Sequence, residues 1–190
     1  ANNYSGGKAE TILGKLIKDC RDDLVITSKA SQRIGQDVNA LGSSRRHIMQ
    51  AIEQSLTRLQ TDRIDLYFIH HFDPLTPMDE TLRALDDLVR QGKVLYLGVS
   101  NWAAWQIAKA LGISERAGLA RFECIEPMYN LVKRQAEVEI LPLAESEQLG
   151  VISYSPLAAG LLTGKYAAGV KPASGRIVEK DQYSQRYSTT

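Results

Sequence analysis

Several apolar stretches of strand length in this sequence end in side chains that can do acid–base chemistry. Residues 66–71 (LYFIHH) run directly into two of the chain's three histidines, and another apolar stretch ends at Lys29. A histidine can transfer protons near neutral pH. A buried lysine is costly unless it has a partner or a task, such as forming a Schiff base or lowering the pKa of a tyrosine. Both positions are therefore candidates for a catalytic site. The alternative is that they are ordinary polar residues at strand ends, which hydrogen-bond to their own backbone.

A metal site is disfavoured by the geometry of a strand. Neighbouring residues on a strand point to opposite faces, so His70 and His71 do not readily chelate one ion. The two cysteines, Cys20 and Cys124, lie far apart and form no CxxC pair. This spacing argues against zinc and against a disulfide framework, and it favours a reducing compartment. We therefore expect no metal and a cytoplasmic protein.

Residues 160–165 (GLLTGK) are similar to a phosphate-binding P-loop without matching it. A P-loop has four residues between its glycines and a Ser or Thr after its lysine, whereas here three residues separate the glycines and a tyrosine follows Lys165. A glycine-rich turn with a lysine nearby still suits a phosphate group. On this pattern alone, an ordinary turn between a strand and a helix explains the segment equally well.

These candidate residues need structural elements that bring them together, and the apolar pattern predicts strands that alternate with helices. Continuous apolar runs are typical of strands covered on both faces, and they predict strands over 24–28, 64–70, 94–99, 122–125 and 151–154. Helical periodicity and capping residues predict helices over 13–20, 48–59 after Ser43 and Ser44, 76–92 with Thr76 as N-cap, 102–111, and 134–148 with an interruption at Pro142. This alternation predicts an α/β fold with a parallel sheet.

Two architectures have such an alternation, a doubly wound sheet and a (β/α)8 barrel. No GxGxxG motif follows any predicted strand, so the usual dinucleotide signature of the doubly wound sheet is missing. Barrel enzymes build their sites from polar residues at the carboxyl ends of the strands, which here are Lys29, His70, Ser100, Asn101, Glu126, Tyr154 and Ser155. We predict a parallel (β/α)8 TIM barrel with about five of its eight βα units in residues 1–166. The remaining residues, 167–190, are predicted to be a loop or a disordered tail.

Five segments, in order along the chain, resemble motifs of the aldo-keto reductase family. They are 4–10 (YSGGKAE), 24–29 (LVITSK), 65–70 (DLYFIH), 98–102 (GVSNW) and 154–166 (YSPLAAGLLTGKY). The resemblance covers nearly the whole chain. It is strongest to the branch that includes bacterial general aldehyde reductases and potassium-channel β subunits. It also implies that the sequence is truncated at both ends relative to a complete barrel.

The resemblance implies that the protein reduces an aldehyde or ketone to an alcohol by hydride transfer from NADPH. Tyr4 would protonate the carbonyl oxygen, Lys29 would lower the pKa of Tyr4, and His70 would orient the substrate. The implied cofactor-binding residues are Ser100, Asn101, Glu126, Tyr154, Ser155, Pro156, Leu157, Ala158, Gly160 and Lys165. Glu126 departs from the family, which usually has a glutamine at this position, and a carboxylate accepts hydrogen bonds without donating them unless it is protonated.

Two other functions stay open on the sequence. One is a redox-sensing regulatory module of the channel β-subunit type that binds the cofactor with little turnover. The other is a barrel lyase that forms a Schiff base on Lys29. The net charge of +1 and the lack of a long apolar segment favour a small-molecule carbonyl substrate over nucleic acid or a membrane as partner. A homo-oligomer is compatible with the sequence, and the identity of the carbonyl substrate is not encoded in any motif.

Overall fold

The computed structural model describes residues 1–166 and 172–187. Its centre is one parallel sheet of five strands in the order β1-β2-β3-β4-β5. The strands are β1 (Thr27–Ala30), β2 (Ile64–Ile69), β3 (Val94–Ser100), β4 (Phe122–Glu126) and β5 (Gly150–Val151). Strand order follows chain order without the reversal that defines a doubly wound sheet. The structure therefore confirms the predicted α/β fold, a part of a (β/α)8 barrel that contributes five strands.

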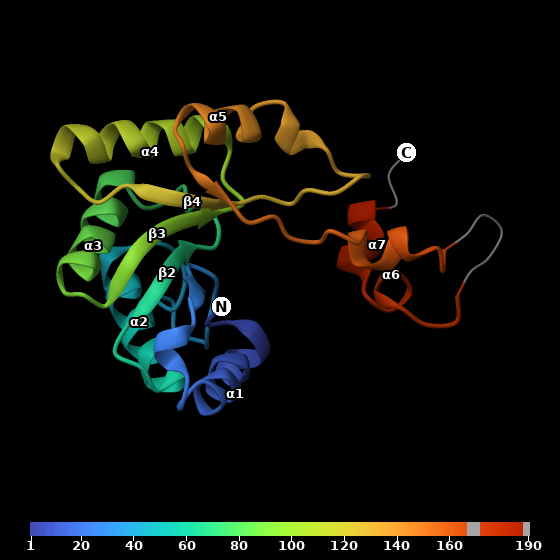
Figure 1. Ribbon diagram of the computed structural model, residues 1–190, viewed down its shortest axis with the longest axis horizontal. Coiled ribbons are helices and arrows are strands. Elements are labelled where there is room, and N and C mark those ends of the chain that lie inside the picture. The colour runs from blue at the N-terminus through green and yellow to red at the C-terminus, as the bar shows by residue number, and fades with distance from the viewer. Residues whose placement is uncertain (167–171, 188–190) are drawn as a thin grey trace.

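Helices precede the sheet and connect its strands (Figure 1). They are α1 (Lys8–Leu16), α2 (Arg45–Leu59), α3 (Met78–Arg90), α4 (Ala104–Ala117) and α5 (Ile140–Ser146). Short 3-10 turns lie at η1 (Tyr4–Gly7), η2 (Arg21–Asp23), η3 (Gln135–Glu137) and η4 (Ala158–Thr163). Each predicted helix is present, although most of the helix bounds differ from the prediction by several residues.

The starts of three helices show which sequence signals decide a boundary. Ser44 caps α2 as predicted, because its side chain accepts a hydrogen bond from the backbone N–H of His47 at 3.3 Å. Thr76 does not cap α3, since its hydroxyl instead donates to Asp73 Oδ2 at 2.7 Å and the helix begins after Pro77. Pro142 lies in the first turn of α5, where backbone N–H groups need no helical partner, so it is tolerated inside the helix.

The first helix ends at Leu16, earlier than predicted, and its contact face combines Leu13, which packs against the core, with residues that are not apolar. The expected stripe over 13–20 included Leu16, yet this side chain is 72% exposed and the helix ends there. The buried residues of α1 are instead Glu10 and Gly14. A Cβ on Gly14 would lie 2.6 Å from the backbone of Leu59, so the glycine lets α1 approach the end of α2 closely.

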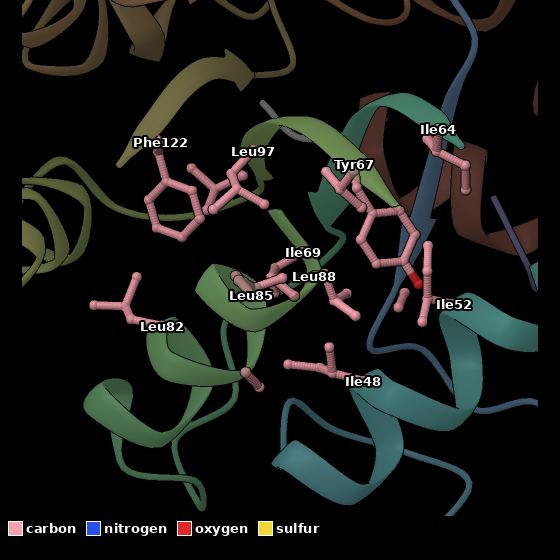
Figure 2. Close-up of a cluster of buried hydrophobic side chains, with 14 of the residues drawn as sticks. Ile48, Ile52, Ile64, Tyr67, Ile69, Leu82, Leu85, Leu88, Leu97 and Phe122 are labelled. Atoms are coloured by element: carbon pink, nitrogen blue, oxygen red, sulfur yellow. The ribbon is translucent and has the colours of Figure 1, made fainter. Parts of the chain in front are cut away.

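The main hydrophobic core lies between the sheet and the helices (Figure 2). Tyr67 and Ile69 of β2 point into it. Among the largest fully buried side chains are Ile48, Ile52, Leu82, Leu85, Leu88, Leu97 and Phe122. Leu66, Phe68 and Cys124 form a separate small cluster, because alternate residues of a strand point to opposite faces. His70 lies directly after the end of β2.

The carboxyl-terminal segment contains more regular structure than the sequence predicts. Within 172–187 the chain forms α6 (Arg176–Glu179) and α7 (Asp181–Tyr187), which lie beyond the carboxyl ends of the strands (Figure 1). These helices have no apolar stripe and are held by polar and aromatic contacts, such as that of Arg176 over the ring of Tyr183 at 5.8 Å. The prediction of a loop or disordered tail is therefore wrong for the residues of these helices. Residues 167–171 and 188–190 lie outside the described part, and a domain boundary at residue 166 stays a prediction.

Candidate active site

The carboxyl ends of the strands bring most of the predicted site residues around one cavity. The cavity has a volume of about 320 Å³ and opens at the end of the sheet where parallel strands present their last residues. Its lining includes seven residues singled out from the sequence, namely Tyr4, His70, Ser100, Asn101, Glu126, Tyr154 and Ser155. The strand register aligns Ser100 with Glu126, so their rim positions are adjacent.

A tight glycine-containing loop presents Tyr4 to this cavity. Gly6 and Gly7 have φ values of 62° and 88°, a left-handed conformation that glycine adopts without steric cost. A Cβ on Gly7 would also lie 2.9 Å from Cδ of Arg58, so the loop sits tightly on α2. The Tyr4 side chain remains half exposed, and its ring meets the ring of His70 edge-on, with centroids 5.9 Å apart. The loop therefore holds a phenol next to an imidazole at the mouth of the cavity.

Lys29 is buried and forms an ion pair with Glu126. Its Nζ lies 2.9 Å from Glu126 Oε2 and 5.0 Å from the ring centroid of Phe68. The pKa of Tyr4 is raised, first by burial and then by the negative charge of Glu126 and the proximity of Tyr183. In this structure the charge of Lys29 is paired with the same Glu126 carboxylate that raises the pKa of Tyr4, and an effect of Lys29 on that pKa stays a prediction.

His70 is kept neutral by its surroundings. Burial lowers its pKa to about 3, and the neighbouring His71 and Lys29 add to this effect. Its Nδ1 is buried and has no hydrogen-bond partner among the described residues. The ring of His71 stacks on His70 at 5.0 Å and lines the same cavity, although strand alternation predicts opposite faces. The reason is that β2 ends at Ile69, so the alternation no longer applies to the two histidines.

A hydrogen-bond network joins the ends of β2, β3 and β4 to the chain after β5. Asn101 Nδ2 donates to the backbone oxygen of His70 at 3.1 Å and to Ser100 Oγ at 2.9 Å. The Tyr154 hydroxyl donates to Asn101 Oδ1 at 2.6 Å. Ser100 Oγ in turn donates to the backbone oxygen of Glu126 at 3.0 Å. This network fixes the orientation of an amide, a hydroxyl and a phenol at the edge of the cavity.

The segment after Tyr154 forms a compact turn beside the cavity. Ser155 lines the cavity, whereas the other residues predicted for cofactor binding here lie outside its lining, namely Pro156, Leu157, Ala158, Gly160 and Lys165. Ala158 is fully buried, so its side chain cannot contact a ligand. Gly160 has a φ of 99°, and a Cβ there would lie 2.9 Å from Cε of Lys165. The glycine thus allows the lysine to fold back onto the turn.

Helix α7 contributes three cavity residues that the sequence analysis did not identify. Gln182, Tyr183 and Arg186 line the cavity from the side opposite the strands. Tyr183 and Arg186 are three residues apart, so on a helix they share one face. This spacing is the one sequence signal that they act together, but it applies only on a helix. The segment has no apolar periodicity and so gave no reason to predict a helix.

Two negative findings bound the site within residues 1–166 and 172–187. No group of three or more His, Cys, Asp or Glu side chains is arranged to hold a metal ion there. In the same part of the chain, no helix combines the length and apolar character that crossing a lipid bilayer requires.

Comparisons with known proteins show which sequences this chain is similar to. The chain is similar to a probable voltage-gated potassium channel subunit beta from Oryza sativa subsp. japonica, with 40% identity over 93% of this chain and 55% of that protein. A probable voltage-gated potassium channel subunit beta from Arabidopsis thaliana is 38% identical over 93% of this chain and 55% of its own length. A putative voltage-gated potassium channel subunit beta from Schizosaccharomyces pombe is 37% identical over 92% and 52%. The chain thus spans about half the length of the curated relatives it matches.

Residues 1–187 match the sequence profile described as the aldo/keto reductase family. On this match, together with a parallel βα sheet whose carboxyl edge carries the site, the chain belongs to the aldo-keto reductase family of oxidoreductases.

Proposed function

We propose that this chain carries the catalytic part of an NADPH-dependent reductase that converts an aldehyde or ketone to an alcohol. The observation that carries the proposal is the pairing of Tyr4 with a neutral His70, 5.9 Å apart, at the mouth of a cavity at the carboxyl end of the sheet. Membership of an oxidoreductase family supports this interpretation. A phenol and an uncharged imidazole side by side can protonate and orient a carbonyl oxygen.

The cavity fits the nicotinamide end of the proposed cofactor. It is concave, its volume is in the range of small-molecule sites, and amide-type hydrogen-bonding groups converge on it. His70 adds a buried ring nitrogen that has no hydrogen-bond partner in the described part of the chain. Ser100, Asn101 and Glu126 would hold the carboxamide, Tyr154 would stack on the ring, and Ser155 with the turn to Lys165 would meet the phosphates. When bound, NADPH would supply a hydride to the carbonyl carbon.

The residues of the chain would handle the proton and the orientation of the substrate. Tyr4 would donate its hydroxyl proton to the carbonyl oxygen, and its raised pKa keeps this proton in place across the neutral range. Neutral His70 would hold the same oxygen through a ring N–H. The ion pair of Lys29 with Glu126 would leave the pocket without a free buried charge beside Tyr4. Burial of Lys29 in this pair does not favour the Schiff-base alternative, which needs an accessible uncharged amine.

A redox-sensing regulatory module is the second candidate function. Two observations favour it: the raised pKa of Tyr4, which makes the phenol a weak acid, and the channel-subunit names of the similar proteins. Under this function the cofactor binds and turns over slowly. A cytoplasmic location, which rests on the free thiols of Cys20 and Cys124, and a homo-oligomeric state stay predictions.

The test is aldehyde-dependent oxidation of NADPH by the intact protein, with 4-nitrobenzaldehyde as substrate. We expect Tyr4→Phe to lower kcat by about a hundredfold or more, the usual contribution of a general acid, while the affinity for NADPH stays the same. Tyr96→Phe is the matched control, because Tyr96 is exposed and does not line the cavity. Equal kcat values for the two variants would refute the role of Tyr4. Tight NADPH binding without turnover in the unmodified protein would favour the regulatory module, and no NADPH binding would exclude both functions.

A further inference from the structure

A second cavity of about 470 Å³ adjoins the candidate active site. Asn101, Glu126, Tyr154 and Arg186 line both cavities, so the two are separated by a shared wall. The second cavity lies on the side of α4 and α5, which contribute Ile107 and Ile140 to its lining. No residue that carries the proposed reaction chemistry, neither Tyr4 nor His70, reaches it. This cavity therefore needs an explanation of its own.

Part of the lining of this cavity is apolar and buried, and one of these side chains has an unsatisfied hydrogen-bond donor. Val99, Ile125 and Trp102 belong to its lining and are buried. Trp102 is 5% exposed, and its ring is held edge-on by Phe72 and Phe122 at 5.1 and 5.6 Å. The indole Nε1 is buried and has no hydrogen-bond partner among the described residues. Such a donor costs free energy when unpaired, and a ligand oxygen would satisfy it.

The lining of the cavity also carries positive charge. Lys133 and Arg186 line it from different segments of the chain, and neither forms an ion pair with a carboxylate of a described residue. Glu126 is the carboxylate of the lining, and it is paired with Lys29. Two cations that face one cavity without a counter-charge make it attractive to an anion.

The backbone segments that carry the two cations are joined by hydrogen bonds. Asn130 and Lys133 close a turn with two backbone hydrogen bonds of 3.2 and 3.1 Å. Asn130 Nδ2 then donates to the hydroxyl of Tyr187 at 3.4 Å, and this hydroxyl donates to Sδ of Met128 at 3.6 Å. Tyr187 directly follows Arg186 on α7, so this contact ties the backbone beside Arg186 to the turn that carries Lys133. The fold therefore joins the two segments from which the cations extend.

We propose that this second cavity is a binding site for an organic acid with an apolar body. Its carboxylate would lie between Lys133 and Arg186 and accept the hydrogen bond of Trp102 Nε1. Its hydrocarbon part would pack against the apolar lining residues, such as Val99 and Ile125. The size of the cavity is in the range of small-molecule sites. The site does not depend on the proposed carbonyl reduction, although the shared wall couples its occupancy to the neighbouring cavity.

Calorimetric titration of the intact protein with octanoate tests the site directly. We expect saturable binding of one octanoate per chain and at least tenfold weaker binding of the neutral octanamide. Lys133→Met and Arg186→Met should each weaken octanoate binding by about tenfold, the usual cost of losing a charge-assisted contact. Lys109→Met is the matched control, because Lys109 is exposed on α4 and lines neither cavity, and it should bind octanoate unchanged. Absent binding, or equal affinity in all three variants, would overturn the proposal.

A second arm separates this site from the candidate active site. We expect increasing NADP⁺ to shift the octanoate affinity to a limiting value, since the two cavities share a wall but not their volume. A shift that keeps growing in proportion to NADP⁺ would mean that both ligands occupy one space. That result would assign the cavity to the cofactor site and overturn the proposal. Octanoate binding that persists in a protein that does not bind NADP⁺ would support the site even if the proposed reductase function failed.

Discussion

The ion pair between Lys29 and Glu126 leads to a prediction that joins stability to catalysis. At 2.9 Å and an effective dielectric constant of about 20, the attraction between the two charges is about 6 kcal/mol. The change Glu126→Gln removes this attraction and leaves the ammonium of Lys29 largely buried, with side-chain exposures of 9% for Lys29 and 15% for Glu126. The glutamine oxygen can still accept a hydrogen bond, which offsets part of the loss. We therefore expect the free energy of unfolding to fall by about 3 kcal/mol, near the low end for breaking a buried pair.

The matched control is Glu123→Gln on the same strand. Glu123 is exposed, and its carboxylate lies 3.9 Å from Arg121, so its replacement should change stability by about 0.5 kcal/mol or less. Urea denaturation of both variants at pH 7 measures the difference, provided that the slope with denaturant is unchanged. If Glu126→Gln is no less stable than Glu123→Gln, the pair does not hold the rim together and the reasoning is refuted.

The same variant tests the electrostatics of the proposed proton donor. The charge of Glu126 helps to raise the pKa of Tyr4, so Glu126→Gln should lower that pKa while burial still keeps it raised. Ultraviolet titration of Tyr4, taken as the difference between each protein and its Tyr4→Phe form, measures this directly. An unchanged or higher pKa in Glu126→Gln would contradict the account of the site. The readout does not require turnover, so it holds for either proposed function.

Two further perturbations follow from the packing and from the buried histidine. Gly14→Ala should destabilise the fold by about 1–3 kcal/mol, because its Cβ would lie 2.6 Å from the backbone of Leu59. In Gly112→Ala, on α4, the new Cβ meets no atom within 4 Å, so this variant should be more stable by about 0.5–1 kcal/mol. Thermal unfolding of the two variants compares them, and a neutral Gly14→Ala would disprove the close approach of α1 to α2. Burial of His70 lowers its pKa from 6.5 to about 3, so between these values the unfolded chain binds a proton that the folded chain does not. Stability should therefore fall as pH decreases from 6.5, by at most about 1.4 kcal/mol per pH unit from this group, and His70→Gln should reduce the fall measured by urea denaturation at pH 7 and 5. An equal fall in both proteins would contradict a buried neutral histidine.

Much of the fold was predictable because the strands and helices carry local signals. Buried parallel strands such as β2 appear as continuous apolar runs, and Ser44 marks the start of α2 by its capping chemistry. The predicted bounds failed where a tertiary contact replaced the local signal. Gly14 contacts α2 through its backbone, and Thr76 bonds Asp73 rather than the first turn of α3. No sequence pattern encodes these two contacts. The residues of α2 that Gly14 meets lie far along the chain, and Asp73 competes with the first turn of α3 for the hydroxyl of Thr76.

The candidate site likewise has features that the sequence predicts and features that only tertiary contacts decide. The sequence by itself determined which residues stand at the rim, since a polar residue after each apolar run must lie at the carboxyl edge of a parallel sheet. It also determined the family, because five short motifs occur in the right order. Only the tertiary structure decided how these residues are paired: Lys29 forms an ion pair with Glu126, and His71 stacks on His70 because β2 ends one residue early. Helix α7 and its Arg186 likewise reach the site through contacts with residues distant in the sequence. A polar segment without apolar periodicity gives no local signal of the surface on which it packs.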